Sequence, residues 1–137
     1  MNVLKIIKSM KNMFKDCMSL KYLYLDNFDT SQVNNMNGMF SYCISLVSLN
    51  LKNFNLTSIQ DSGNMFSSCK SLTTLDLSNF NNATPTTISE MFSDCESLIS
   101  LDISSFNVSL VGNMNKFLYN CKSLISLNLM NFDKFKA

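Results

Sequence analysis

Five cysteines are the residues of this chain best placed for chemistry, because they recur at a constant interval. Cys17, Cys43, Cys69, Cys95 and Cys121 stand 26 residues apart in a chain of 137 residues. Metal sites built on cysteine pairs use much shorter ligand spacings, and an odd number of thiols cannot all pair as disulfides. We therefore expect five free thiols that pack in the core and bind no metal.

Other groups that could catalyse a reaction lack partners. The chain has no histidine, so a serine or cysteine nucleophile has no imidazole base. A column of serines, from Ser19 to Ser123, recurs with the same period as the cysteines. Their hydroxyls are expected to bond to backbone groups in turns. We predict that the chain is not an enzyme, and that it has no catalytic residue and no cofactor.

The charge composition argues against a nucleic-acid partner. The chain has 11 basic and 10 acidic side chains, a net charge of +1, and no arginine. Arginine is the side chain whose planar fork reads phosphates and guanine edges. The apolar runs are also far shorter than the roughly 20 residues that span a bilayer. The sequence therefore predicts no nucleic-acid partner and no membrane span.

The interval of 26 residues divides the whole chain into repeats. A fixed period in this range is typical of stacked repeat arrays. We expect a single domain over residues 1–137, which consists of a partial repeat 1–12, full repeats 13–38, 39–64, 65–90 and 91–116, and a partial repeat 117–137.

Each repeat carries the pattern of a leucine-rich repeat, L-x-x-L-x-L-x-x-F, for example from Leu20 to Phe28. The second and third leucines alternate with polar residues, which indicates a short strand with one buried face. The five strands are expected at residues 22–26, 48–52, 74–78, 100–104 and 126–130.

The segment before each cysteine has a different apolar spacing. Val33, Met36, Met39, Phe40 and Cys43 are separated by three and four residues, which predicts one stripe of a helix. One strand and one helix per repeat predict an α/β fold. The expected architecture is a leucine-rich-repeat solenoid, a right-handed, horseshoe-like superhelix with five parallel strands and helical return arms.

The repeat motif Met-Phe-x-x-Cys-x-Ser-Leu-x-x-Leu-Asp/Asn-Leu-x-x-Phe resembles the 26-residue repeat of BspA-like leucine-rich-repeat surface proteins, a module also found in mycoplasma surface lipoproteins. The resemblance covers essentially the whole chain. It implies a horseshoe-type solenoid on a cell surface and, as in bacterial members, adhesion to host matrix proteins or to other cells. It implies no catalytic residues.

A binding site, if present, is expected where the strand side chains point away from the core and form a concave face. Tyr22 and Tyr24 are the large side chains of this face, and aromatic residues supply interface energy at low entropic cost. The candidate partner-binding residues are Tyr22, Tyr24, Asp26, Asn50, Lys52, Asp76, Asp102 and Asn128.

Two functions of different classes fit these features. The first is a non-enzymatic binding or adhesion module, on the cell surface or secreted, with a protein ligand such as a host or extracellular-matrix protein. The alternative is a cytoplasmic scaffold or structural repeat protein without a dedicated ligand. Neither terminus shows a capping module, so we expect the chain to be a segment of a longer array or to associate end to end.

Overall fold

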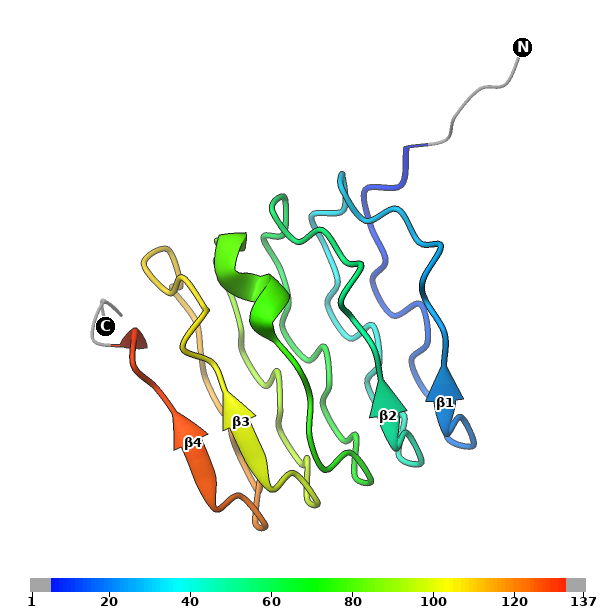
Figure 1. The fold of residues 1–137 in the computed structure, drawn as a ribbon, viewed down its shortest axis with the longest axis vertical. Coiled ribbons are helices and arrows are strands. Elements are labelled where there is room, and N and C mark those ends of the chain that lie inside the picture. The colour runs from blue at the N-terminus through cyan, green and yellow to red at the C-terminus, as the bar shows by residue number, and fades with distance from the viewer. Residues whose placement is uncertain (1–5, 133–137) are drawn as a thin grey trace.

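The computed structural model describes residues 6–132; residues 1–5 and 133–137 of the two partial repeats lie outside the described residues. The described chain winds in successive coils that lie side by side (Figure 1). Its elements are the strands β1 (Tyr22–Leu23), β2 (Ser48–Leu49), β3 (Ser100–Asp102) and β4 (Ser126–Asn128), and the 3-10 helix η1 (Ser78–Asn82).

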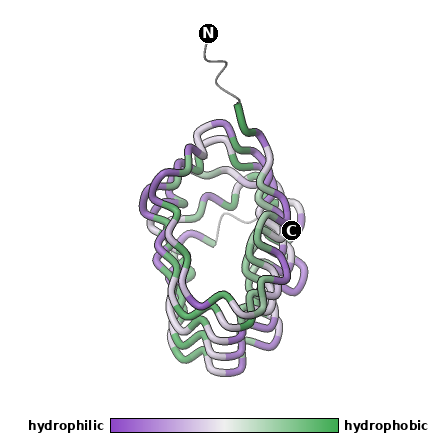
Figure 2. Tube along the Cα trace, turned by 90° about the vertical axis from the view of Figure 1, so that its right-hand side faces the viewer, coloured by the Kyte–Doolittle hydropathy of each residue, from purple (hydrophilic) through white to green (hydrophobic). Residues whose placement is uncertain are grey.

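Neighbouring coils pair in parallel with a register of one repeat. Tyr22 of β1 lies opposite Ser48 of β2, and Ser100 of β3 lies opposite Ser126 of β4. A second row of parallel bridges joins Ser9, Asn35, Asp61, Thr87 and Asn113 in turn. Viewed along the stack, the coils lie one behind another around a common interior (Figure 2). Each coil therefore corresponds to one repeat.

The expected α/β leucine-rich-repeat solenoid, with its horseshoe of five parallel strands and its helical return arms, is wrong. Residues 6–132 contain no α-helix, and their four strands form two separate two-stranded sheets. The segment 74–78, expected as the middle strand, is not a strand. Four of the expected strand segments contain a strand, which is only two or three residues long.

Backbone conformation explains why the segments before the cysteines are not helical. Gly38 and Tyr42 flank the Met-Phe pair of one coil, and both have a positive φ, of 65° and 61°. The same two positions have positive φ in the neighbouring coils, for example 54° at Asn64 and 60° at Ser68. Left-handed residues four apart cannot belong to a right-handed helix. Instead, each segment is a series of four-residue turns.

Hydrogen bonds in these segments alternate between two kinds of acceptor. The N–H groups of Gly38, Phe40 and Tyr42 donate to carbonyls of the next coil, as Phe40 does to Met65 over 2.9 Å. The intervening N–H groups close turns within the coil, as that of Cys43 does with the carbonyl of Phe40 over 3.1 Å. Successive turns repeat every two to three residues, which produces the apolar spacing that indicated a helix.

The third described coil departs from the others at Asn82. The equivalent residues Thr30, Leu56 and Val108 are buried, and an unpaired amide at this place would be costly. Here the chain winds through η1, which leaves Asn82 exposed and turns Ala83 into the core. The extra 3-10 turn begins at the end of the segment expected as the middle strand. Asn82 therefore lies outside the buried column.

The core is a set of columns in which identical side chains stack from coil to coil. The rings of Phe14, Phe40, Phe66 and Phe92 stack at centroid distances of 5.7, 5.6 and 5.4 Å, with interplanar angles of 5°, 7° and 10°. These distances approach the spacing of hydrogen-bonded strands, about 4.8 Å. The hydrogen bonds between coils therefore set the spacing of the aromatic stack.

Substitution of Gly38 tests the left-handed turn. A Cβ at Gly38 would lie 2.3 Å from Asn12 Oδ1, at a φ of +65°. We expect Gly38→Ala to lower the unfolding free energy by about 1–3 kcal/mol, as measured by urea denaturation. The control is Gly112→Ala, because the nearest atom to its new Cβ is 4.0 Å away. This control should leave stability unchanged or raise it by up to about 1 kcal/mol. Equal effects of both changes would contradict the turn.

Candidate binding face

The strand face, defined by residues 22–26, 48–52, 74–78, 100–104 and 126–130, carries all eight predicted partner-binding residues. Seven of them are exposed and Asn128 is half-buried; the exposed residues are Tyr22, Tyr24, Asp26, Asn50, Lys52, Asp76 and Asp102. Strands β1 and β2 bring Tyr22 and Ser48 into register, so the first two coils contribute one continuous part of this face.

Four of the predicted residues serve the fold, because their side chains form turns. Asn50 Oδ1 accepts a hydrogen bond from the N–H of Lys52 at 3.0 Å, and Asp76, Asp102 and Asn128 each accept one from the residue two positions later, at 2.9 to 3.1 Å. Such Asx turns redirect the chain at the end of a strand. Asn or Asp recurs at the same place in four repeats, and this pattern indicates the turn-forming role.

We call Asn50, Asp76, Asp102 and Asn128 the turn column. Its two aspartates are held ionised. Hydrogen bonds from the hydroxyl of Ser104, which has the larger effect, and from its N–H stabilise the carboxylate of Asp102 and lower its pKa. The N–H of Ser78, which has the larger effect here, and its hydroxyl lower the pKa of Asp76 in the same way. No group of three His, Cys, Asp or Glu side chains in residues 6–132 is arranged to hold a metal ion. The carboxylates are thus engaged with backbone and hydroxyl donors.

The first coil breaks the turn column, because Tyr24 stands where the later coils have Asn or Asp. Tyr24 is 85% exposed and Tyr22 is 59% exposed. With Asp26, Ser48 and Asn50 they line a shallow cavity of about 210 Å³. We call these five residues the tyrosine patch. Its two large aromatic side chains form no turn and do not pack in the core.

The cysteine column links neighbouring coils through its thiols. The thiol of Cys95 donates to the backbone carbonyl of Phe66 at 3.1 Å, and Cys43, Cys69 and Cys121 make the same contact with the preceding coil. All five cysteines are free; the middle three are buried, whereas Cys17 and Cys121 are half-buried. Burial raises the pKa of Cys43 to about 11 and that of Cys95 to about 12.

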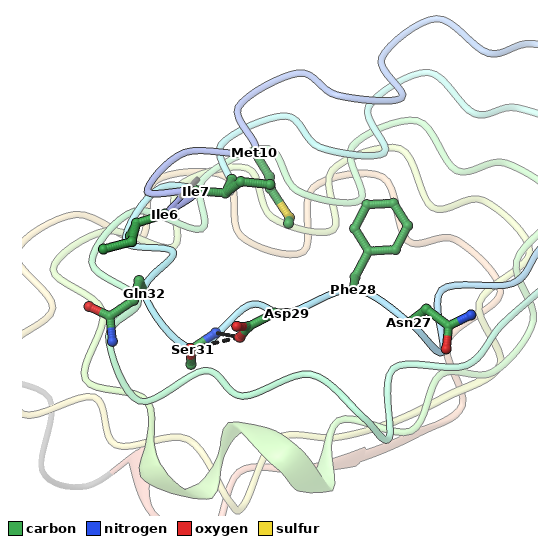
Figure 3. A pocket seen from close by; sticks show the side chains of 8 residues that line it. All are labelled: Ile6, Ile7, Met10, Asn27, Phe28, Asp29, Ser31 and Gln32. Atoms are coloured by element: carbon green, nitrogen blue, oxygen red, sulfur yellow. Dashed lines mark hydrogen bonds between the residues drawn. The ribbon is translucent and has the colours of Figure 1, made fainter. Parts of the chain in front are cut away.

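A larger cavity, missed by the sequence analysis, lies at the N-terminal end of the stack. It has a volume of about 450 Å³, and Ile6, Ile7, Met10 and Phe28 supply its apolar wall (Figure 3). At its rim, Asp29 accepts hydrogen bonds from the N–H and hydroxyl of Ser31. We call this space the end cavity. Among the described residues the core columns begin beside this cavity, and no motif in the sequence marks it.

The comparisons with known proteins bear on this arrangement. Residues 8–135 match a family model described as "Mycoplasma protein of unknown function, DUF285". The chain belongs to this family. The DUF285 match covers nearly all the coils, so the chain is a repeat protein of a Mycoplasma-associated family. Neither the comparison with curated proteins nor that with solved structures found a match. In the described part of this DUF285 chain, no helix is long and apolar enough to cross a membrane.

The pH dependence of stability tests the buried thiols. The unfolded chain releases the Cys95 proton near the ordinary pKa of 9.0, whereas the folded chain retains it up to about 12. Above pH 9 the unfolded state binds fewer protons, so stability should fall as the pH rises from about 9 to about 12.

Cys95→Ala should make this decline shallower, by at most about 1.4 kcal/mol per pH unit. Urea denaturation of both proteins, below pH 9 and near pH 10, measures the difference. All other ionisable groups are common to both proteins, so their contributions cancel. Parallel curves for the two proteins would show that the Cys95 thiol is not buried.

Proposed function

We propose that this protein is a non-enzymatic binding module that recognises a protein partner through the tyrosine patch. The observation that supports this proposal is the break in the turn column at Tyr24. In the later coils the same position forms an Asx turn, so a tyrosine there forgoes a stabilising turn. Exposed aromatic side chains without a structural role are typical of binding surfaces.

The chemistry of the patch fits a protein surface better than a small molecule. Its cavity of about 210 Å³ is small and shallow for an enclosed ligand site, which typically measures roughly 300–1,000 Å³. Tyr22 and Tyr24 are amphipathic, and Asp26 and Asn50 place polar groups beside them. An aromatic centre with a polar rim is the usual composition of a protein interface.

The location and the kind of partner follow from the resemblance of the repeat motif to BspA-like surface proteins. We propose that the protein acts on the cell surface or after secretion, in adhesion to host or extracellular-matrix proteins. The Mycoplasma association of the DUF285 family is compatible with this proposal. Labelling of intact and permeabilised cells with an antibody separates it from the cytoplasmic scaffold.

Tyr24→Asn tests the patch, because it restores the residue type of the turn column. The N–H of Asp26, two residues later, has no hydrogen-bond partner among the described residues and can then donate to the new side chain. We expect the unfolding free energy to stay constant or rise by up to about 1 kcal/mol. Binding to immobilised extracellular-matrix proteins should weaken by about 2 kcal/mol, roughly 30-fold in Kd.

The matched control is Tyr119→Ala, which removes a tyrosine that is 58% exposed and lies outside the strand face. It should leave binding unchanged, whereas Tyr22→Ala should weaken binding as Tyr24→Asn does. Undiminished binding by both patch variants would contradict the proposal. Absence of any binding by the wild-type chain, together with antibody labelling only in permeabilised cells, would favour the scaffold function instead.

A further inference from the structure

The two tyrosines of the tyrosine patch stand on the same side of one extended segment. Leu23, between them, packs against the core, whereas Tyr22 and Tyr24 are exposed and line the same cavity. Residues two apart in a strand are separated by about 6.6 Å. This separation is close to twice the roughly 3.5 Å at which carbon atoms make optimal contact. One planar group can therefore stack between the two rings.

The rest of the cavity is small and polar. Ser48 and Asn50 of the second coil line it beside the tyrosines, where β1 and β2 lie side by side (Figure 1). The amide oxygen of Asn50 is held by the N–H of Lys52. A volume of about 210 Å³ is below the roughly 300 Å³ at which ligand pockets begin. The space suits one inserted side chain better than a whole ligand.

Asp26 adds a carboxylate that other residues leave free. It lines the same cavity as the tyrosines and is exposed. Lys52 occupies the equivalent position in the second coil, but it does not pair with Asp26. Among residues 6–132 the salt bridges are those of Glu96 with Lys70 and Lys122. The tyrosine patch therefore contains a negative charge without a partner in the described chain.

The charges of the whole strand face favour a cationic partner. Its three carboxylates, those of Asp26, Asp76 and Asp102, face one ammonium group, that of Lys52, which leaves a net charge of −2, whereas the chain as a whole carries +1. Hydrogen bonds lower the pKa of Asp76 and Asp102, so both stay ionised at neutral pH. A surface with this field attracts and orients partners of the opposite charge.

An exposed tyrosine elsewhere in the chain already has a cation beside it. The Nζ atom of Lys116 lies 5.7 Å from the centre of the Tyr119 ring. The face of an aromatic ring attracts cations because its electron density is negative. No lysine in residues 6–132 lies over Tyr22 or Tyr24 in this way. The rings of the tyrosine patch are thus available to a cation from a partner.

We infer that the tyrosine patch binds an arginine side chain of the protein partner, an inference that rests on the function proposed above. The guanidinium group is planar and stacks between Tyr22 and Tyr24, and its positive charge pairs with Asp26. A lysine ammonium group has the charge but not the plane, and an aromatic ring has the plane but not the charge. This sequence contains no arginine, so a second copy of it cannot supply the group.

Nuclear magnetic resonance titration of the whole chain with Nα-acetyl-arginine amide tests the site without a partner. We expect saturable shifts of the Tyr22 and Tyr24 ring signals, with a Kd in the millimolar range, and no shift at Tyr119. The citrulline derivative keeps the shape but lacks the charge, and the lysine derivative keeps the charge but lacks the plane. Both should bind about tenfold more weakly than arginine.

Asp26→Asn tests the carboxylate, because it keeps the size of the side chain and removes its charge. Arginine should bind this variant about tenfold more weakly, whereas the weak binding of citrulline should not change. Asp16→Asn is the matched control, since Asp16 is exposed and lies outside the strand face. It should bind arginine as the wild-type chain does. Circular dichroism checks that both variants are folded.

The partner is tested with immobilised extracellular-matrix proteins whose arginines have been modified with phenylglyoxal before the chain is added. Their binding to the wild-type chain should weaken at least about tenfold, whereas matrix proteins with acetylated lysines should bind as untreated ones do. Such a difference would support an arginine contact in the complex.

Three results would overturn the inference. The first is an absence of saturable arginine shifts at Tyr22 and Tyr24, and the second is equal affinity for arginine, citrulline and lysine. The third is unchanged binding to phenylglyoxal-treated matrix proteins that still depends on Tyr24, which would leave the proposed function intact. Saturable arginine shifts without binding to any matrix protein would support the arginine site and contradict the proposed adhesion.

Discussion

The backbone hydrogen bonds between coils are the interaction on which the rest of this structure depends. In the Met-Phe segments every second N–H points to the next coil, so a single coil cannot satisfy its own backbone. Unpaired backbone groups are costly once they are buried. Left-handed residues turn these N–H groups toward the next coil. The chain adopts this conformation even at Tyr42, Glu90 and Lys116, at some cost in strain. The stacked phenylalanines, the thiol contacts and the column of Asx turns all follow the resulting register.

The sequence predicted the period, the inward columns and the start of the four strands that the described residues form, because these depend on side-chain type at fixed spacing. It could not distinguish a helix from a series of turns, since both bring residues three and four apart to one side. Gly38, Asn12 and Asn64, which precede the Met-Phe pairs, were a sign of left-handed turns. Glu90 and Lys116 at the same position obscured that sign. The expected middle strand at 74–78 is absent, and the 3-10 helix η1 begins at its last residue, Ser78.

The sequence analysis assigned the candidate residues to one face, but it did not separate the residues that form turns from those that are free to contact a partner. All eight residues lie on the strand face, yet Asn50, Asp76, Asp102 and Asn128 form turns there. Polarity and exposure alone do not separate a turn former from a contact residue. In a repeat protein, a residue that differs in type from its equivalents in the other repeats is the more informative one, because the shared residue type reflects what the fold requires. Tyr24 is such a residue.

Nuclear magnetic resonance can test the hydrogen bonds between coils most directly, through scalar couplings across individual hydrogen bonds. The structure predicts a coupling between the amide nitrogen of Phe40 and the carbonyl carbon of Met65. The amide nitrogen of Phe40 lies 2.9 Å from the carbonyl oxygen of Met65. A coupling from the amide of Phe40 to the carbonyl of Met36, four residues earlier, would instead show an α-helical segment and contradict this account.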